Sequence, residues 1–135
     1  MNANHIRELA SATVSGSMSF PEIVGKLVTE GVEYYHVDYV ALQMTFYGSE
    51  DGVVIAPLIF TGFPAVSKEF NASALKAAIL DSQQNGQKFT DFSVRAAKAG
   101  VAGYFAYLRG QRVIYFGRQG DRHVEWFPGS KPTDA

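Results

Sequence analysis

A histidine and a glutamate near the end of the chain are the residues whose types and spacing best suit chemistry. His123 and Glu125 lie two positions apart in a segment typical of a β-strand, so both side chains should point to the same face of a sheet. A histidine beside a carboxylate can act as a general base or hold a polar ligand. Trp126 adds an amphipathic surface, and Arg118 and Arg122 lie in the adjoining turn and in the same strand. The sequence predicts these five residues as a ligand-binding site; the alternative is an edge strand whose charges prevent pairing with other chains.

His36 and Asp38 form a second pair with the same spacing. They could serve as a general base with its orienting carboxylate, or as two metal ligands. A related segment later in the chain carries Phe105 and Tyr107 at the corresponding positions, so this face accommodates large aromatic side chains. Because an H-x-D pair without a third partner meets none of the geometric requirements of a site, we expect no chemistry and no metal here.

Other catalytic motifs are missing from the sequence. There is no cysteine, which excludes disulfides and thiolate zinc sites, and no serine lies in a G-x-S-x-G setting. The turns at 48–52 and 117–120 contain glycine but are not followed by a helix or by Gly-Lys-Ser/Thr, so they do not fit a phosphate-binding loop. We therefore expect no metal, no cofactor and no enzymatic activity; the alternative is an enzyme built on His123, Glu125 and tyrosines between two halves of the chain.

Composition indicates an ordinary globular protein. The chain has 135 residues, of which 47% are hydrophobic and 19% charged, and its net charge is −1. This balance is neither that of a basic nucleic-acid binder nor that of a disordered acidic tail. The N-terminus has no signal-peptide pattern, and the longest apolar stretch, 53–60, contains Pro57 and is too short to cross a bilayer. We expect a soluble cytoplasmic protein with no membrane partner.

Residue types recur 69 positions apart, which indicates a tandem duplication. Aligning 20–48 with 89–117 without a gap gives five identities: Phe20/Phe89, Gly31/Gly100, Val32/Val101, Tyr35/Tyr104 and Gly48/Gly117. The same offset aligns Ile6 with Leu75. We predict one domain, 1–135, built from two repeats of about 2–58 and 71–127.

Each repeat is expected to hold two helices followed by a three-stranded meander. Apolar residues at helical spacing predict helices over 2–12, 21–30, 72–82 and 90–99. Aromatic and β-branched residues predict strands over 32–39, 42–47, 53–58, 101–108, 111–116 and 122–127. Gly31 and Gly100 follow the second helix of each repeat, where a glycine with positive φ ends a helix. The prediction is an α+β fold with helices on one side of an antiparallel sheet.

Aromatic residues concentrate in the predicted hairpins, on both faces of each strand pair. One face must pack on the helices, so the other exposes tyrosines, is buried between the halves or forms an interface. Exposed rings with Arg109, Arg112 and Arg118 could stack on single-stranded nucleic acid. The net charge of −1 argues against that partner, because phosphate neutralisation supplies most of such affinity.

The stretch from Leu75 to Pro128, together with Gly31–Gly48, resembles the bacterial family of unknown function usually labelled phage-envelope-protein-like. The motifs that carry the resemblance are Gln84, Gly86, Phe89, the Ala-Gly-Val at 99–101 and the aromatic pair before Gly117. The resemblance covers residues 20–128 and implies a small bacterial or prophage-encoded protein with no established activity. Relatives have tryptophan at the position of Tyr104 and aspartate at that of Tyr107, so the counterpart of this aspartate is kept only in the first repeat, as Asp38.

The two repeats carry opposite charge. Residues 20–52 hold six acidic residues and one lysine, whereas 89–121 hold five basic and two acidic residues. Complementary halves could steer association of the chain with itself or with a charged partner, although neutral drift of solvated surfaces would give the same pattern. The function expected from the sequence is that of a non-enzymatic interaction or small-ligand-binding module. Its complementary halves could bring copies together as a homo-oligomer.

Overall fold

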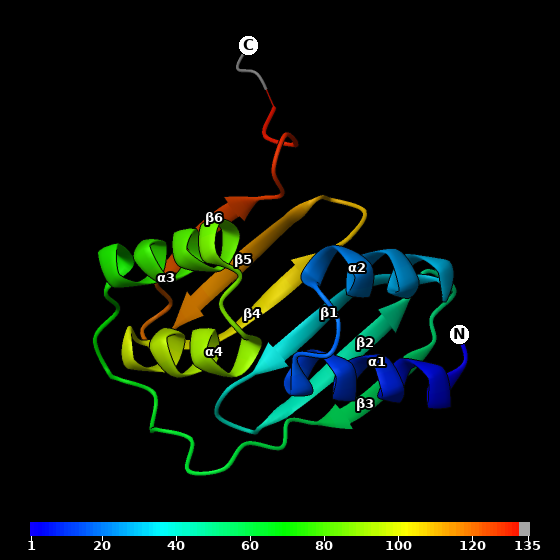
Figure 1. Cartoon of the computed structure of the whole chain (residues 1–135), viewed down its shortest axis with the longest axis horizontal. Helices are drawn as coiled ribbons and strands as arrows, with labels where there is room; N and C mark the ends of the chain where they lie inside the picture. Colours follow the sequence, from blue (N-terminus) through cyan, green and yellow to red (C-terminus); the bar gives the residue numbers. More distant parts are fainter. Residues whose placement is uncertain (133–135) are drawn as a thin grey trace.

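The computed structural model describes residues 1–132. Within them the chain forms four helices and six strands, in the order expected from the sequence (Figure 1). The elements are α1 (Ala3–Ser15), α2 (Phe20–Thr29), β1 (Val32–Asp38), β2 (Gln43–Gly48), β3 (Val53–Pro57), α3 (Ala72–Asn85), α4 (Phe89–Lys98), β4 (Val101–Tyr107), β5 (Arg112–Gly117) and β6 (Arg122–Trp126).

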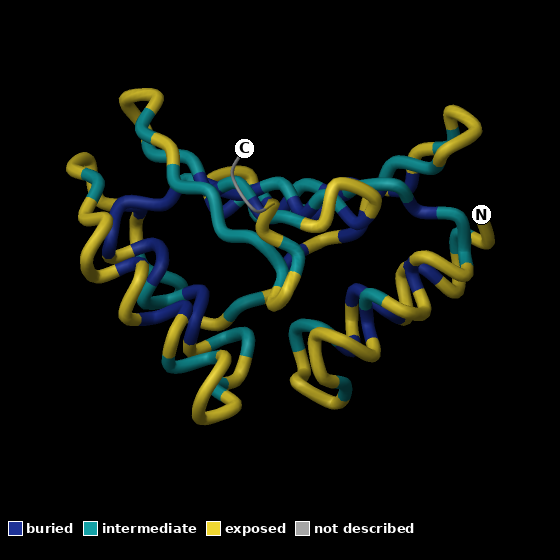
Figure 2. The backbone as a smooth tube through the Cα atoms, turned by 90° about the horizontal axis from the view of Figure 1, so that it is seen from above, coloured by how far each residue is buried: buried dark blue, intermediate teal, exposed yellow. Residues whose placement is uncertain are grey.

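The six strands form one antiparallel sheet in the order β3-β2-β1-β4-β5-β6. All four helices lie on the same side of it, with α1 packed on α2 and α3 packed on α4 (Figure 1). Viewed from above, the helix pairs form two separate legs below the sheet, and no helix in the described part of the chain covers its other side (Figure 2). The predicted α+β class, with helices on one side of the sheet, is confirmed.

The two repeats are related by a local two-fold axis that passes between the central strands. His36 of β1 lies opposite Phe105 of β4, and these are equivalent positions 69 residues apart. Equivalent hydrogen bonds flank the axis: the Tyr39 amide donates to the Ala102 carbonyl at 2.9 Å, and the Leu108 amide donates to the Glu33 carbonyl at 3.0 Å. The backbone therefore repeats with the offset read from the sequence, as a duplication requires.

Helix boundaries follow from local capping, and they differ by a few residues from those predicted. The side chains of Asn2 and Asn71, also 69 positions apart, accept hydrogen bonds from the His5 and Ala74 amides and begin α1 and α3. Both helices run three residues further than predicted, to Ser15 and Asn85, and are capped by Gly16 and Gly86. The predicted starts of α2 and α4 were one residue late; α2 begins behind a Ser19–Glu22 capping box, whereas α4 begins at Phe89 without a side-chain cap.

The second strands also begin one residue later than predicted. Leu42 and Gln111, assigned to strands from the sequence, instead end the preceding turns with positive φ of 56° and 55°. They are equivalent positions, so both hairpins close through the same left-handed residue. The strand pattern could not reveal this, because leucine and glutamine rarely adopt that conformation.

Exchanging the residue with positive φ in the β2–β3 turn for that of the β5–β6 turn should change the stability of the protein. Asp51 has φ +65°, and its counterpart is Gly120, which has φ +84° and open space for at least 4 Å around the position a Cβ would take. We expect Asp51→Gly to raise the free energy of unfolding by about 0.5 kcal/mol by relieving left-handed strain, and Gly120→Asp to lower it by a similar amount. Urea unfolding of both variants checks this; a loss of stability in Asp51→Gly would contradict it.

Candidate functional site

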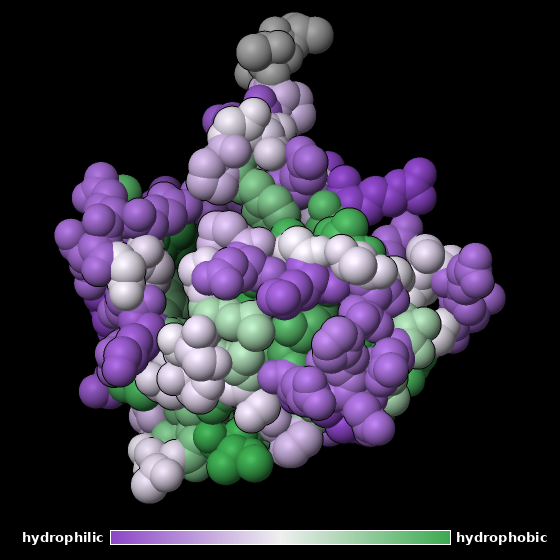
Figure 3. Space-filling view, turned by 45° about the vertical axis from the view of Figure 1, so that its right-hand side comes forward, coloured by the Kyte–Doolittle hydropathy of each residue, from purple (hydrophilic) through white to green (hydrophobic). Residues whose placement is uncertain are grey.

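The side of the sheet opposite the helices, which we call the open face, is the most distinctive surface of the molecule. Side chains alternate along each strand, so Tyr35 and Val37 are buried under the helices while Tyr34, His36 and Asp38 point to the open face. The cross-strand pairs place these further residues on the same face: Thr45, Tyr47, Val53, Ile55, Phe105, Tyr107, Arg112, Ile114, Phe116, Arg122, Val124 and Trp126. On the helix side, hydrophilic side chains cover much of the surface and apolar residues show between them (Figure 3).

A depression of about 400 Å³ lies on the open face beside the local two-fold axis, and we call it the Gly103 pocket. Its lining residues are His36, Asp38, Val40, Ala102, Gly103, Phe105 and Phe116. They come from β1, β4, β5 and the turn after β1. The His36 and Phe105 rings stack on the axis with centroids 4.3 Å apart, and Phe116 meets Phe105 edge to face at 5.9 Å.

The equivalent position in the other repeat is filled. There Tyr34 takes the place of Gly103, and its ring lies between Tyr47, 4.6 Å away, and Tyr107, 5.7 Å away. An ion pair of 3.3 Å between Arg109 and Glu33 lies at the positions equivalent to Val40 and Ala102. The duplication thus supplies an internal comparison. On one side of the axis the Tyr34 ring fills the position, and on the other side the position above Gly103 is open.

Three differences between the repeats account for the Gly103 pocket. Gly103 has no side chain, and a Cβ there would lie 2.5 Å from the Val37 carbonyl oxygen, so the close approach of the strands requires glycine. Asp38 replaces the third ring of the stack, Tyr107. Val40 and Ala102 replace the ion pair with short apolar side chains.

Asp38 is the acidic residue among those that line the Gly103 pocket, and Arg122 is the cross-strand neighbour of Phe116 on the same face. One oxygen of the Asp38 carboxylate, Oδ1, accepts hydrogen bonds from the amides of Val40 and Ala41, each 2.9 Å long, and so shapes the turn after β1. Burial lowers the pKa of His36, and the nearby Asp38 opposes this only in part. Because His36 is neutral at neutral pH, the pocket presents one carboxylate and aromatic walls.

The predicted pair His123 and Glu125 does form. Its Nε2 and Oε1 atoms are 3.1 Å apart, both side chains are partly buried, and the His123 ring stacks at 6.2 Å on Tyr115. Tyr115 faces the helices, so the pair lies on the helix side of β6. The pair is therefore separated from the Gly103 pocket by the sheet.

The other three predicted ligand-binding residues do not join this pair. Arg122 and Trp126 alternate with His123 and point to the open face, where the Arg112 guanidinium lies 4.0 Å over the Trp126 ring. Arg118, in the turn before β6, donates to the Val66 carbonyl at 3.4 Å and so ties down the connector between the repeats. Side chains alternate between the two faces along β6, so residues that are adjacent in the sequence lie on opposite sides of the sheet.

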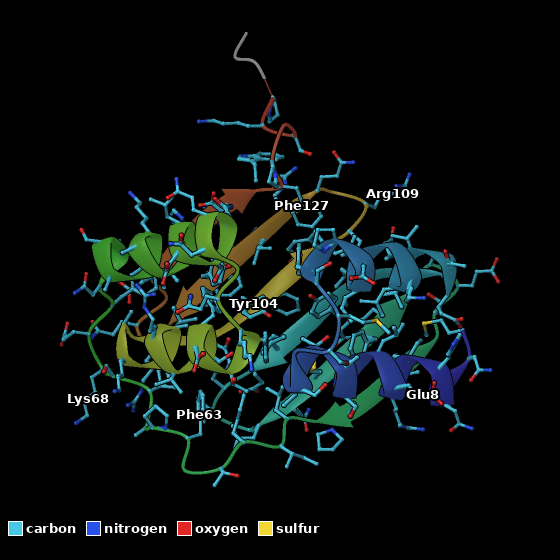
Figure 4. The ribbon with its side chains drawn as sticks, in the orientation of Figure 1. Glu8, Phe63, Lys68, Tyr104, Arg109 and Phe127 are labelled. Atoms are coloured by element: carbon cyan, nitrogen blue, oxygen red, sulfur yellow. The ribbon has the colours of Figure 1, made fainter. Side chains whose placement is uncertain are left out.

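Buried tyrosines lie between the two halves, as an enzyme built on tyrosines would require. Tyr104 of β4 lies near the centre of the molecule (Figure 4), and the hydroxyls of Tyr39 and Ser93 are 2.8 Å apart. Burial raises the pKa of Tyr35, Tyr39, Tyr104 and Tyr115. These hydroxyls stay protonated near neutral pH, which does not suit a general base.

A second, smaller depression of about 220 Å³ lies between α1 and β3 and is lined in part by Arg7, Val14 and Ile59. Within residues 1–132, no three His, Asp or Glu side chains lie close enough together to hold a metal ion. The three arginines considered for nucleic acid are spread along β5 and its two turns, and each contacts a different partner within the chain.

Of the seven residues that line the Gly103 pocket, only His36 and Asp38 were considered as site residues from the sequence. The other five, Val40, Ala102, Gly103, Phe105 and Phe116, were not predicted. The signal was available in the repeat alignment, where a glycine stands against Tyr34 at an open-face position. Recognising Gly103 as part of a site required the knowledge that β1 pairs with β4 and that Asp38 lies opposite Gly103.

No helix in the described part of the chain is long and apolar enough to cross a membrane. Comparison with curated proteins found no match. A family model described as "Protein of unknown function (DUF1398)" matches residues 2–124, which is most of the chain, and the chain belongs to this family.

Proposed function

We propose that this protein is a non-enzymatic binding module that holds a small ligand on the open face of its sheet. The observation that carries the proposal is the Gly103 pocket, which keeps open the space that the other repeat fills with Tyr34. Small-ligand sites typically combine apolar or aromatic walls with a few polar groups, and here Phe105 and Phe116 provide the walls and Asp38 the polar group.

The alternative of an enzyme rests on His123 and Glu125, which form a pair on the helix side. Neither of the two depressions described above is lined by these residues. A ligand in the Gly103 pocket would lie across the sheet from them. The open face therefore favours binding over catalysis, and a phage origin and a cytoplasmic location stay predictions of the sequence.

Ligand binding can be tested by nuclear magnetic resonance on the whole chain. The probes are three phenols that contain the ring of the Tyr34 side chain: neutral p-cresol, cationic tyramine and anionic 4-hydroxyphenylacetate. We expect at least one of them to shift the amide signals of His36, Gly103 and Phe116 in a saturable way. Shifts confined to the helix side, or no shift with any of the three at millimolar concentration, would overturn the proposal.

Removing one wall of the Gly103 pocket should weaken binding. We expect Phe116→Ala to lower the affinity for the bound phenol by about tenfold, because stacking on an aromatic side chain contributes roughly 1–3 kcal/mol. Tyr47 is the equivalent residue of the filled repeat, so Tyr47→Ala is the matched control and should leave the affinity nearly unchanged. Titration calorimetry measures both, and equal losses would show that the ring acts through stability rather than contact.

Self-association is a second candidate, because the repeats differ in charge and because Val53 and Ile55 on β3 are 54% and 52% exposed. If the oppositely charged halves bring two copies together, the dimer should weaken as salt rises, since exposed charges are screened beyond about 10 Å at about 0.1 M. Sedimentation at low and high salt measures this. A monomer at every salt concentration would exclude self-association.

A further inference from the structure

The filled repeat shows what shape the Gly103 pocket accepts. The Tyr34 ring lies nearly parallel to Tyr47, at 13°, and at 26° to Tyr107. The local two-fold axis relates this arrangement to the space above Gly103, with Phe116 in the position of Tyr47. A flat six-membered ring can therefore lie on Phe116 as Tyr34 lies on Tyr47.

The two positions differ in the group on the far side of the ring. In the filled repeat that group is the Tyr107 ring, whereas in the Gly103 pocket it is the carboxylate of Asp38. A carboxylate attracts a positive charge and repels a negative one, and the attraction increases where apolar walls exclude water.

The ion pair of the filled repeat is also absent. Arg109 pairs with Glu33 there, whereas the equivalent residues at the Gly103 pocket are the uncharged Val40 and Ala102. Asp38 accepts the Val40 and Ala41 amides through Oδ1. The stacked rings His36 and Phe105 add an uncharged wall near neutral pH.

From this geometry we infer that the Gly103 pocket selects a flat aromatic ring that carries a positive charge, such as an arylalkylamine or a protonated nitrogen heterocycle. The inference rests on the proposed function and names its ligand class. The ring stacks on Phe116, and the cationic group lies beside the Asp38 carboxylate. Rings carrying a carboxylate or phosphate are rejected, because Asp38 repels them.

The three phenols separate ring recognition from charge recognition. Tyramine, p-cresol and 4-hydroxyphenylacetate share one ring and differ in charge. We expect tyramine to bind at least about tenfold more tightly than p-cresol, and 4-hydroxyphenylacetate to bind more weakly than both, because one charge pair near a protein surface is sufficient for such a ratio. Calorimetry gives the affinities, and amide shifts at Asp38 and Gly103 locate the ligand.

Two variants test the cause of the preference. Asp38→Asn removes the charge while its side-chain oxygen can still accept the Val40 and Ala41 amides, so the turn should persist. It should bring the affinities for tyramine and p-cresol within about twofold of each other. Val40→Arg introduces the residue type of Arg109 at a side chain that is 68% exposed, and it should reduce tyramine binding without unfolding the chain.

The outcomes separate this inference from the proposed function. Equal binding of all three phenols at the Gly103 pocket, or an unchanged preference for tyramine in Asp38→Asn, would overturn the cationic class and leave the binding module standing. Binding of none of them would overturn both. Preference for tyramine that disappears in Asp38→Asn, with amide spectra showing a folded variant, would support both.

Discussion

Replacing Gly100 with alanine should lower the free energy of unfolding by about 3 kcal/mol or more, whereas the same change at Gly31 should cost about 1 kcal/mol. Both glycines end the second helix of a repeat with positive φ, of 90° and 85° respectively. The φ values confirm the prediction made from the sequence. The strain of a left-handed backbone is therefore common to the two positions. It accounts for the expected loss of about 1 kcal/mol at Gly31.

The surroundings of the two glycines explain the larger cost at Gly100. An added Cβ at Gly100 would overlap the backbone carbonyl of Glu69, whereas at Gly31 no atom lies within 4 Å. Glu69 belongs to the connector that joins the repeats, and the neighbouring Asn71 amide donates to the Ala99 carbonyl at 2.7 Å. The connector would have to move away from the end of α4, which would strain this bond and the start of α3.

Urea unfolding of the two alanine variants, monitored by circular dichroism, measures the difference directly. Each variant serves as the control for the other, because Gly31 and Gly100 have similar φ and carry the same substitution. Equal losses would mean that the connector adapts without cost, and the explanation through Glu69 would then be wrong.

Alkaline pH should unfold the protein above about pH 10. Burial raises the pKa of Tyr35, Tyr39, Tyr104 and Tyr115 above the ordinary value of 10.0, and no such burial acts in the unfolded chain. As pH rises through that value, the unfolded chain loses these protons while the folded chain keeps them. Their contribution is therefore fully present below pH 10 and is lost above it.

The expected slope is large because four groups act together. Each raised tyrosine removes about 1.4 kcal/mol of stability per pH unit, and four remove about 5 kcal/mol per pH unit until the folded-state pKa values are reached. A domain with a typical stability of about 5–15 kcal/mol then unfolds within about one to three pH units. Circular dichroism against pH, with tyrosinate absorbance recorded on the same samples, measures both events.

Tyr39→Phe is the matched variant for this prediction. It should reduce the slope by about a quarter and cost about 1 kcal/mol at neutral pH through loss of the hydrogen bond to Ser93. Ionisation of these four tyrosines well before the loss of structure would contradict the expected coupling.

The sequence by itself determined the parts of this protein that depend on local backbone chemistry. The alternation along the strands and the positive φ of Gly31 and Gly100 were predicted because each depends on a few neighbouring residues. The offset between the repeats was predicted because residue types recur 69 positions apart. At Leu42 and Gln111 the turns take a rare backbone conformation, and the sequence pattern therefore predicted the starts of β2 and β5 one residue too early.

Only the tertiary structure decided where the candidate site lies. The pairing of β1 with β4 joins residues 65 to 73 positions apart and brings Asp38 beside Gly103. It also gives Gly103 the position that Tyr34 has in the other repeat. The packing of the helices on one side then leaves that surface open and places His123 and Glu125 on the opposite side. These outcomes depend on long-range register and layer packing, which neither residue types nor short spacings specify.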